Sequence, residues 1–197
     1  DITFDVTNNI NLAQDVTILT AGDANNDVTI TGTLSATAAG TEGLTIDAVA
    51  GDVTVNTDTN SGVNSLEYFD ITDAANVTLG AVTTQGGDST GYDINIGSDT
   101  AITGNLTLTG DLRTDGVAGD TDGIRFNSSG TVTIDDPANP GSILLETDGT
   151  TATDGPVDFV GGFAVVSDTA YQDGLEINVG SNDLDMTGAT TADLDHL

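Results

Sequence analysis

The sequence contains no cysteine, no lysine and no tryptophan, and only two of its 197 residues, Arg113 and Arg125, are basic. Without cysteine the chain has no disulfide, no thiol nucleophile and no thiolate metal site. Without lysine it has no Schiff-base chemistry. Its apolar runs extend over only a few residues, so we expect no membrane insertion.

Acidic side chains dominate the charge, because 32 Asp and Glu residues give a formal net charge of -30. Nucleic acid is excluded as a partner, since binding it requires Lys and Arg to neutralise phosphates. The same imbalance disfavours docking on anionic lipid. Such a chain repels itself at low ionic strength, so we expect it to depend on salt or on divalent cations such as Ca²⁺.

A short phrase recurs along the chain: Gly, apolar, polar, apolar, then Asn or Asp. It reads GLTID at 43–47, GYDIN at 91–95, GIRFN at 123–127 and GLEIN at 174–178, with looser copies SLEYF at 65–69, PVDFV at 156–160 and DITFD at 1–5. Alternating apolar and polar residues indicate strands, and repeats of this length indicate a solenoid.

These patterns predict an all-β chain with hardly any helix. We expect residues 1–197 to form a single domain, a parallel β-helix (β-solenoid) of about seven irregular coils. Aromatic residues are only 4% of the chain, which suits thin aliphatic stacks. A sandwich of antiparallel hairpins is the alternative fold.

Each slot of the phrase has a physical role in this arrangement. The apolar residues face the interior, and the leading Gly supplies the positive φ of a corner. The trailing amides are expected to stack as a ladder at a corner: Asn95, Asn127 and Asn178. Neighbouring coils lie about 4.8 Å apart, so the central polar residues should form a solvent-facing acid–base–acid ladder of Asp93, Arg125 and Asp158.

Phrases such as NVTLGAVTTQGGD at 76–88 and AITGNLTLTGDL at 101–112 resemble the β-solenoid repeats of large bacterial surface proteins, including filamentous-haemagglutinin-like adhesins. The resemblance covers most of the chain. It implies an extracellular or cell-surface location and a non-catalytic role in a filament, sheath, surface layer or adhesin.

Neither end of the sequence shows a cap for an open solenoid. The chain starts at Asp1 without Met, so we expect either a processed subunit that associates head to tail or a piece of a longer solenoid. Divalent cations and surface glycans are further expected partners.

The segment GDTDGIRFNSSGTVTID at 119–135 resembles the Asn-Thr-Asp-Gly motif of polygalacturonases, which are β-helix glycosidases with clustered aspartates. The run Asp120-Thr121-Asp122-Gly123 would match it, and Asp135 with Asp136 would supply paired carboxylates. The family's Gly-His-Gly and Arg-x-Lys motifs are missing, because His196 is the single histidine and lysine is absent. We therefore expect no enzyme, and a polygalacturonase-like or pectate-lyase-like enzyme or a glycan-binding module is the alternative.

The stretch NTDTNSGVNSLE at 56–67 has the spacing of an EF-hand-like loop. Its Gly62 falls at position seven where the motif requires position six, and no helices flank it. A solvated turn loop is the competing interpretation. The candidate ligands of a structural Ca²⁺ are Asn56, Asp58, Asn60, Asn64 and Glu67.

Overall fold

Strands form where apolar residues alternate with Thr or another polar residue, and each strand pairs in parallel with its neighbours. The computed structural model describes residues 1–22, 26–56, 65–86, 92–115, 121–137, 141–147, 153–168, 173–180, 184–187 and 190–192. Within these ranges the chain forms strands and turns and no helix. The predicted all-β parallel solenoid is confirmed, with about five turns, slightly fewer than expected.

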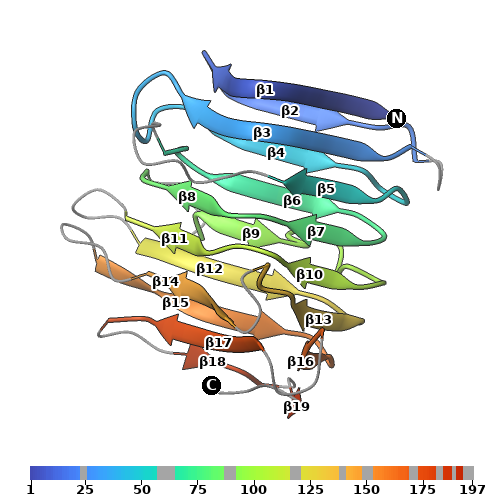
Figure 1. Ribbon diagram of the computed structural model, residues 1–197, viewed down its shortest axis with the longest axis vertical. Coiled ribbons are helices and arrows are strands. Elements are labelled where there is room, and N and C mark those ends of the chain that lie inside the picture. Colours follow the sequence, from blue (N-terminus) through green and yellow to red (C-terminus); the bar gives the residue numbers. More distant parts are fainter. Residues whose placement is uncertain are drawn as a thin grey trace.

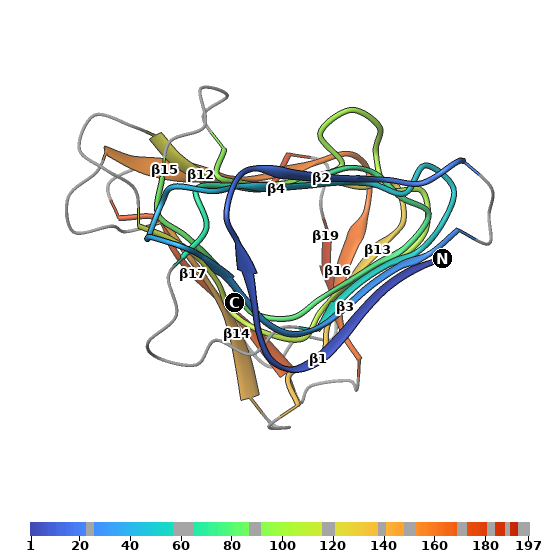
Figure 2. The same cartoon turned by 90° about the horizontal axis from the view of Figure 1, so that it is seen from above.

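Three parallel sheets form the faces of the solenoid (Figures 1 and 2). Sheet A has the strand order β1 (Ile2–Leu12), β3 (Val28–Ala36), β5 (Val53–Asn56), β7 (Val77–Leu79), β10 (Leu106–Leu108), β13 (Thr131–Ile134), β16 (Ala164–Ser167) and β19 (Thr190–Ala192). Sheet B has the order β18 (Leu184–Asp185), β15 (Thr153–Val160), β12 (Thr121–Asn127), β9 (Ile94–Ile96), β6 (Phe69–Asp73), β4 (Leu44–Asp47) and β2 (Val16–Leu19). Sheet C has the order β17 (Asp173–Asn178), β14 (Gly141–Glu146), β11 (Leu112–Thr114) and β8 (Val82–Thr84).

The interior consists of rows of apolar side chains that stack in register from coil to coil. In sheet A one fully buried row is Val28, Val53, Val77, Leu106, Val132 and Val165. In sheet B the corresponding row is Leu44, Phe69, Ile94, Ile124 and Val157. Each such side chain contributes about 1.5–3 kcal/mol when it is fully buried, so these rows are the main source of stability.

Aromatic side chains contact one another in the core of the C-terminal coils. The Phe126 and Phe159 rings stack with their centroids 5.1 Å apart, and the Phe159 and Phe163 centroids are 5.9 Å apart. Three of the five Phe residues therefore form one continuous cluster inside the last coils.

Threonine fills the outward position between the two inward rows of sheet A. Five half-buried hydroxyl side chains stack there in register: Thr29, Thr54, Thr78, Thr107 and Thr133. β-branched residues favour the extended backbone, and Thr–Thr neighbours on adjacent strands stabilise a sheet. The Val-Thr-apolar triplet is thus the true repeating unit of this face.

The glycine phrase occupies no single slot of the coil. GLTID and GIRFN both lie in sheet B, but Ile94 stands opposite Ile124, so GYDIN is displaced by two residues relative to GIRFN. Two other copies lie on other faces: GLEIN forms most of β17 in sheet C, and DITFD begins β1 in sheet A. The expectation that these phrases stack on one another is therefore confirmed for GIRFN and PVDFV, which pair slot for slot, and wrong for GYDIN, GLEIN and DITFD.

Positive φ angles also fall elsewhere than at the leading glycines. Gly43 has no positive φ; a Cβ there would lie 2.2 Å from Cε1 of Tyr68, so this glycine makes room for the ring. Gly97 does have a positive φ (75°), and a Cβ there would lie 2.4 Å from the Asn127 carbonyl oxygen. The described part of the chain holds a single non-glycine residue with positive φ, Val49 at 54°.

Replacing Val49 with glycine is expected to stabilise the protein by about 1 kcal/mol, because a β-branched residue in the left-handed region is strained. Val49 is 38% exposed, so its truncation costs less burial than that of a core valine. Urea unfolding of Val49→Gly measures the gain. Val49→Ala keeps a Cβ at the same φ and should gain less; a Val49→Gly protein less stable than wild type would contradict the strain.

Candidate functional site

A ladder of Asp and Asn side chains runs along the corner at which the chain enters sheet A. Each member precedes the first inward residue of its strand: Asp1, Asp27, Asp52, Asn76 and Asn105. The Asp52 N–H donates to Asp27 Oδ1 (2.9 Å), and Asn76 Nδ2 donates to Asp52 Oδ1 (2.8 Å). The Asn105 N–H then donates to Asn76 Oδ1 (2.8 Å). Each side chain thus satisfies polar groups of a neighbouring coil and fixes the spacing between coils.

The amide ladder predicted from the glycine phrase is wrong. Asn95 lies in the middle of β9, while Asn127 Nδ2 donates to the Gly97 carbonyl (2.9 Å) and Asn178 Nδ2 donates to Glu146 Oε1 (3.3 Å). The three amides therefore belong to three different environments. An Asp or Asn directly before a triplet, as in DVTI, DVTV, NVTL and NLTL, is the signal that locates the real ladder.

Truncating Asn76 to alanine is expected to destabilise the protein by about 1–2 kcal/mol, because two hydrogen bonds that connect three coils are lost. Thermal or urea unfolding measures this change. Asn76→Asp is the matched variant, since it keeps the acceptor for the Asn105 N–H but loses the donor to Asp52 and adds a repelling charge. If alanine at position 76 left stability unchanged, the ladder would contribute nothing to coil spacing.

Arg125 lies on the outer face of sheet B, in register with Asp158 on one side and Asn95 on the other. The predicted neighbour Asp158 is confirmed. The predicted neighbour Asp93 is wrong, because it lies two residues before Asn95 and is buried. The guanidinium carbon of Arg125 lies 5.8 Å from the centroid of the Tyr92 ring, and the Tyr92 hydroxyl donates to Asp158 Oδ2. Arg125, Tyr92 and Asp158 therefore form one cluster on the surface of sheet B.

Burial, together with the hydrogen bond to Asp158 and the charge of that carboxylate, raises the pKa of Tyr92 to about 12. An unfolded tyrosine has a pKa of about 10. The cluster's contribution to stability is therefore present below pH 10 and is lost as pH rises through 12.

Tyr92→Phe is expected to remove the transition near pH 12 from an ultraviolet titration of the protein, which has three tyrosines. Tyr68→Phe, the matched control, should leave the transition near pH 12 in place. A Tyr92→Phe protein that kept this transition would show that the Asp158 contact is not made in solution.

The sequence predicts that Arg125 forms an ion pair between neighbouring coils. In the structure, Arg113 in sheet C forms such an ion pair. Arg113 Nη1 donates to Glu146 Oε2 (2.8 Å) and Nη2 donates to Asp111 Oδ2 (3.0 Å). Asp111 Oδ1 also accepts from the Leu144 N–H (3.0 Å). Within the described ranges, both ion pairs shorter than 4 Å belong to Arg113. It therefore connects β11 to β14, the next strand of sheet C.

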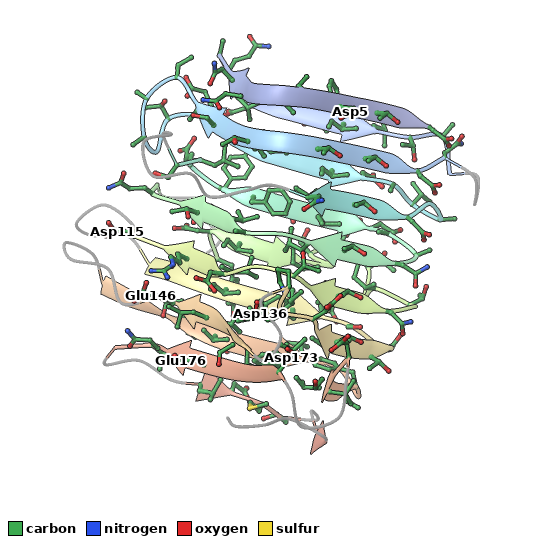
Figure 3. All side chains as sticks on the ribbon, in the orientation of Figure 1. Asp5, Asp115, Asp136, Glu146, Asp173 and Glu176 are labelled. Carbon is green, nitrogen blue, oxygen red and sulfur yellow. The ribbon has the colours of Figure 1, made fainter. Side chains whose placement is uncertain are left out.

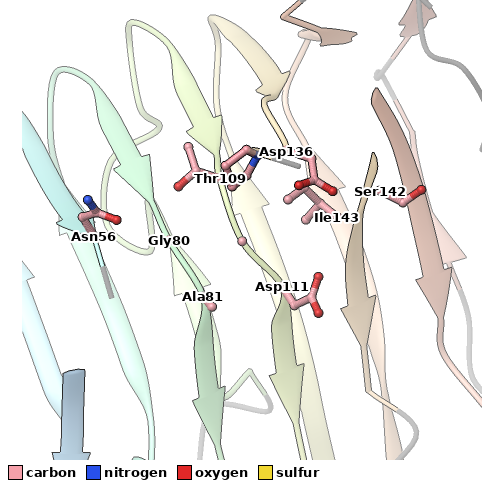
Figure 4. A pocket seen from close by; sticks show the side chains of 10 residues that line it. Asn56, Gly80, Ala81, Thr109, Asp111, Asp136, Ser142 and Ile143 are labelled. Atoms are coloured by element: carbon pink, nitrogen blue, oxygen red, sulfur yellow. The ribbon is translucent and has the colours of Figure 1, made fainter. Parts of the chain in front are cut away.

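A polar groove of about 440 Å³ lies at the corner between sheets A and C (Figure 4). It is open there because successive coils turn this corner through residues with little side chain, namely Gly80, Ala81 and Gly110. The other lining residues are Asn56, Thr109, Asp111, Asp136, Pro137, Ser142 and Ile143. None of the described lining residues is aromatic, so the groove has no ring on which a sugar could stack.

The predicted Ca²⁺ ligands are only partly within the described residues. Asn56 ends β5 and lines the groove, whereas Glu67 lies between Leu66, which bridges Thr84 of sheet C, and Phe69, which begins β6 in sheet B. Three further candidates lie outside the described residues: Asp58, Asn60 and Asn64. The set stays a prediction. The described residues contain no group of three or more His, Cys, Asp or Glu side chains that could hold a metal ion.

The residues that match the polygalacturonase motif are divided between two faces. Asp122 belongs to β12 of sheet B, but its side chain lies outside the described part, as do Asp120 and His196. Asp135 and Asp136 follow β13 of sheet A, and Asp136 borders the groove. A catalytic role for these carboxylates stays a prediction.

Among the described residues, no further strand stacks on the first coil or on the last, and these two coils lie at opposite ends of the molecule (Figure 1). At the N-terminal end, β1 and β2 are edge strands, and Phe4, although it stands in an inward row opposite Ile30, is 41% exposed. At the C-terminal end, β17, β18 and β19 are edge strands, and Leu184, opposite Val157, is also 41% exposed. We call these surfaces the N-face and the C-face.

Comparison with known proteins gives no family: no family model, no curated protein and no solved structure matches the chain. Among the described residues, no helix is long and apolar enough to cross a membrane.

Proposed function

We propose that the protein is a non-catalytic structural rod of an extracellular filament, sheath, surface layer or adhesin, and that it assembles head to tail. The observation that carries this proposal is the pair of open ends. Phe4 and Leu184 stand in inward rows, yet each is 41% exposed because no further described coil covers it. A further coil on either end would bury them.

The edges of the two faces require a particular kind of partner. An edge strand presents unpaired N–H and C=O groups, which a parallel strand in the same register satisfies. All pairings described within the solenoid are parallel, so the C-face of one copy continues the pairing pattern at the N-face of another. Repetition of this contact produces an open fibre, because a head-to-tail contact without rotational closure does not end.

Charge opposes this association and makes it dependent on ions. The N-face carries Asp1 and Asp5, and the C-face carries Asp185 and Glu176, so two acidic surfaces meet. At about 0.15 M salt the screening length is about 8 Å, which weakens such repulsion. We infer that salt or a bound divalent cation such as Ca²⁺ promotes assembly in the setting where the protein works.

Phe4→Asp and Leu184→Asp are each expected to abolish chain growth, because each places a charge in one face. Phe4→Asp keeps an intact C-face, and Leu184→Asp keeps an intact N-face. If docking is head to tail, an equimolar mixture of the two variants should form heterodimers and nothing longer. Sedimentation velocity at low and high salt, with electron microscopy of the wild type, measures the outcome.

Leu19→Asp is the matched control: Leu19 is 64% exposed in the same end coil, but Leu19 is offset by one residue from the inward Ile18 and faces outward. It should assemble like the wild type. Dimers of Leu184→Asp alone would indicate head-to-head contact through the N-face. A wild-type protein that stays monomeric at every salt and Ca²⁺ concentration would overturn the proposal.

A further inference from the structure

The last coils bring three carboxylates together where the chain passes from sheet A to sheet C. Asp135 and Asp168 directly follow Ile134 and Ser167, which are paired in register, so the two carboxylates stand on neighbouring coils. Asp173 begins β17 of sheet C and is fully buried. Three acidic groups thus meet at one corner beside the C-face.

Hydrogen bonds satisfy only one side of the buried Asp173 carboxyl group. The Ser167 hydroxyl donates to Asp173 Oδ2 (3.1 Å), and the Asp173 N–H donates to Ser167 Oγ (3.2 Å). Asp173 Oδ1 is buried and has no hydrogen-bond partner in the described part of the chain. The Asp168 carboxyl group lies within hydrogen-bonding reach of Asp173. An ionised Asp173 would therefore be both desolvated and repelled by its neighbour.

Among the described residues, no positive group compensates this charge. Both arginines are engaged elsewhere, Arg113 with Asp111 and Glu146 and Arg125 over the Tyr92 ring. The charged groups that face Asp173 are all acidic: Asp168 after β16, Asp135 after β13, and Asp136, which lies against Gly141, the register partner of Asp173 in β14. Figure 3 shows Asp136 and Asp173 close together at this end of the solenoid.

We propose that Asp168 and Asp173 form a carboxyl–carboxylate pair that shares one proton, and that this pair fastens β17 to the end of β16 while the proton is held. With the proton in place, one carboxyl group donates to the other and a single negative charge remains. When the proton leaves, two like charges meet at a buried corner. The pair is thus an acid-dependent latch on the coil that forms the C-face.

The direction of the pH dependence follows from the environment. Burial, followed by the Asp168 contact, raises the pKa of Asp173 from 3.8 to about 6. A carboxyl group with a raised folded-state pKa stabilises the folded coil fully below its unfolded pKa. That stability is lost as pH rises from about 3.8 through about 6, so the latch is closed in mild acid and weakened at neutral pH.

Hydrogen exchange of the β17 amides tests the latch. In the Phe4→Asp background, which removes assembly from the measurement, protection of β17 corrected for intrinsic exchange is expected to fall by up to about 100-fold between pH 4 and pH 7. In Asp173→Asn the amide donates permanently to Asp168. The β17 amides of Asp173→Asn should therefore be as protected at pH 7 as those of the protein with Asp173 are at pH 4. Their protection should not change with pH.

Glu176→Gln removes the same charge from the same strand, but at an exposed position, and should leave the fall in protection intact. If Asp173→Asn lowered protection at every pH, Asp173 would be a plain structural acceptor and the latch would be overturned. An equal pH dependence in Asp173→Asn and Glu176→Gln would likewise overturn it, by assigning the effect to net charge. Neither result depends on whether the protein assembles.

Discussion

In-register stacking of like side chains on adjacent coils is the interaction on which this structure depends. Each triplet of sheet A places one apolar residue on another in the interior and one Thr on another outside. Burial of these rows stabilises the coil, while parallel pairing satisfies the backbone. The same contact repeats along the stack, and seen from above the coils largely overlie one another (Figure 2).

Stacking of like residues on adjacent strands limits the positions at which this acidic chain can place carboxylates. A row of carboxylates about 4.8 Å apart would repel along its whole length. Several described rows limit this repulsion: sheet A uses Thr, sheet B interposes Asn95 and Arg125 between Asp70 and Asp158, and sheet C places Arg113 beside Glu146. Carboxylates still stand in register elsewhere in sheet B, for example Asp158 with Asp185 and Asp47 with Asp73. In the ladder at the corner before sheet A, carboxylates accept hydrogen bonds from N–H groups. At Asp173, we propose that a shared proton reduces the negative charge, as a cation would.

The sequence predicts the parallel solenoid well, because short alternating triplets recur with the same residue type at each slot, which stacked coils require and an antiparallel sandwich does not. The sequence predicts the register between strands poorly. The glycine phrase occurs on all three faces, so it does not show whether Asp93 or Asn95 lies beside Arg125. Only the observed pairing of β9 with β12 identifies Asn95. Asp168 and Asp173 carry no motif, and they come together only because the end of β16 in sheet A lies beside the start of β17 in sheet C.

Disulfide trapping in this cysteine-free chain tests the register most directly. Thr54 and Thr78 are register partners, and paired parallel strands lie about 4.8 Å apart, within the roughly 4.4–6.8 Å that a disulfide spans between Cα atoms. The account predicts that a Thr54→Cys, Thr78→Cys protein forms an intramolecular disulfide on mild oxidation. A Thr54→Cys, Thr107→Cys protein, with its thiols two coils apart, should stay reduced. Cross-linking of the second pair in preference to the first would contradict the stacked register.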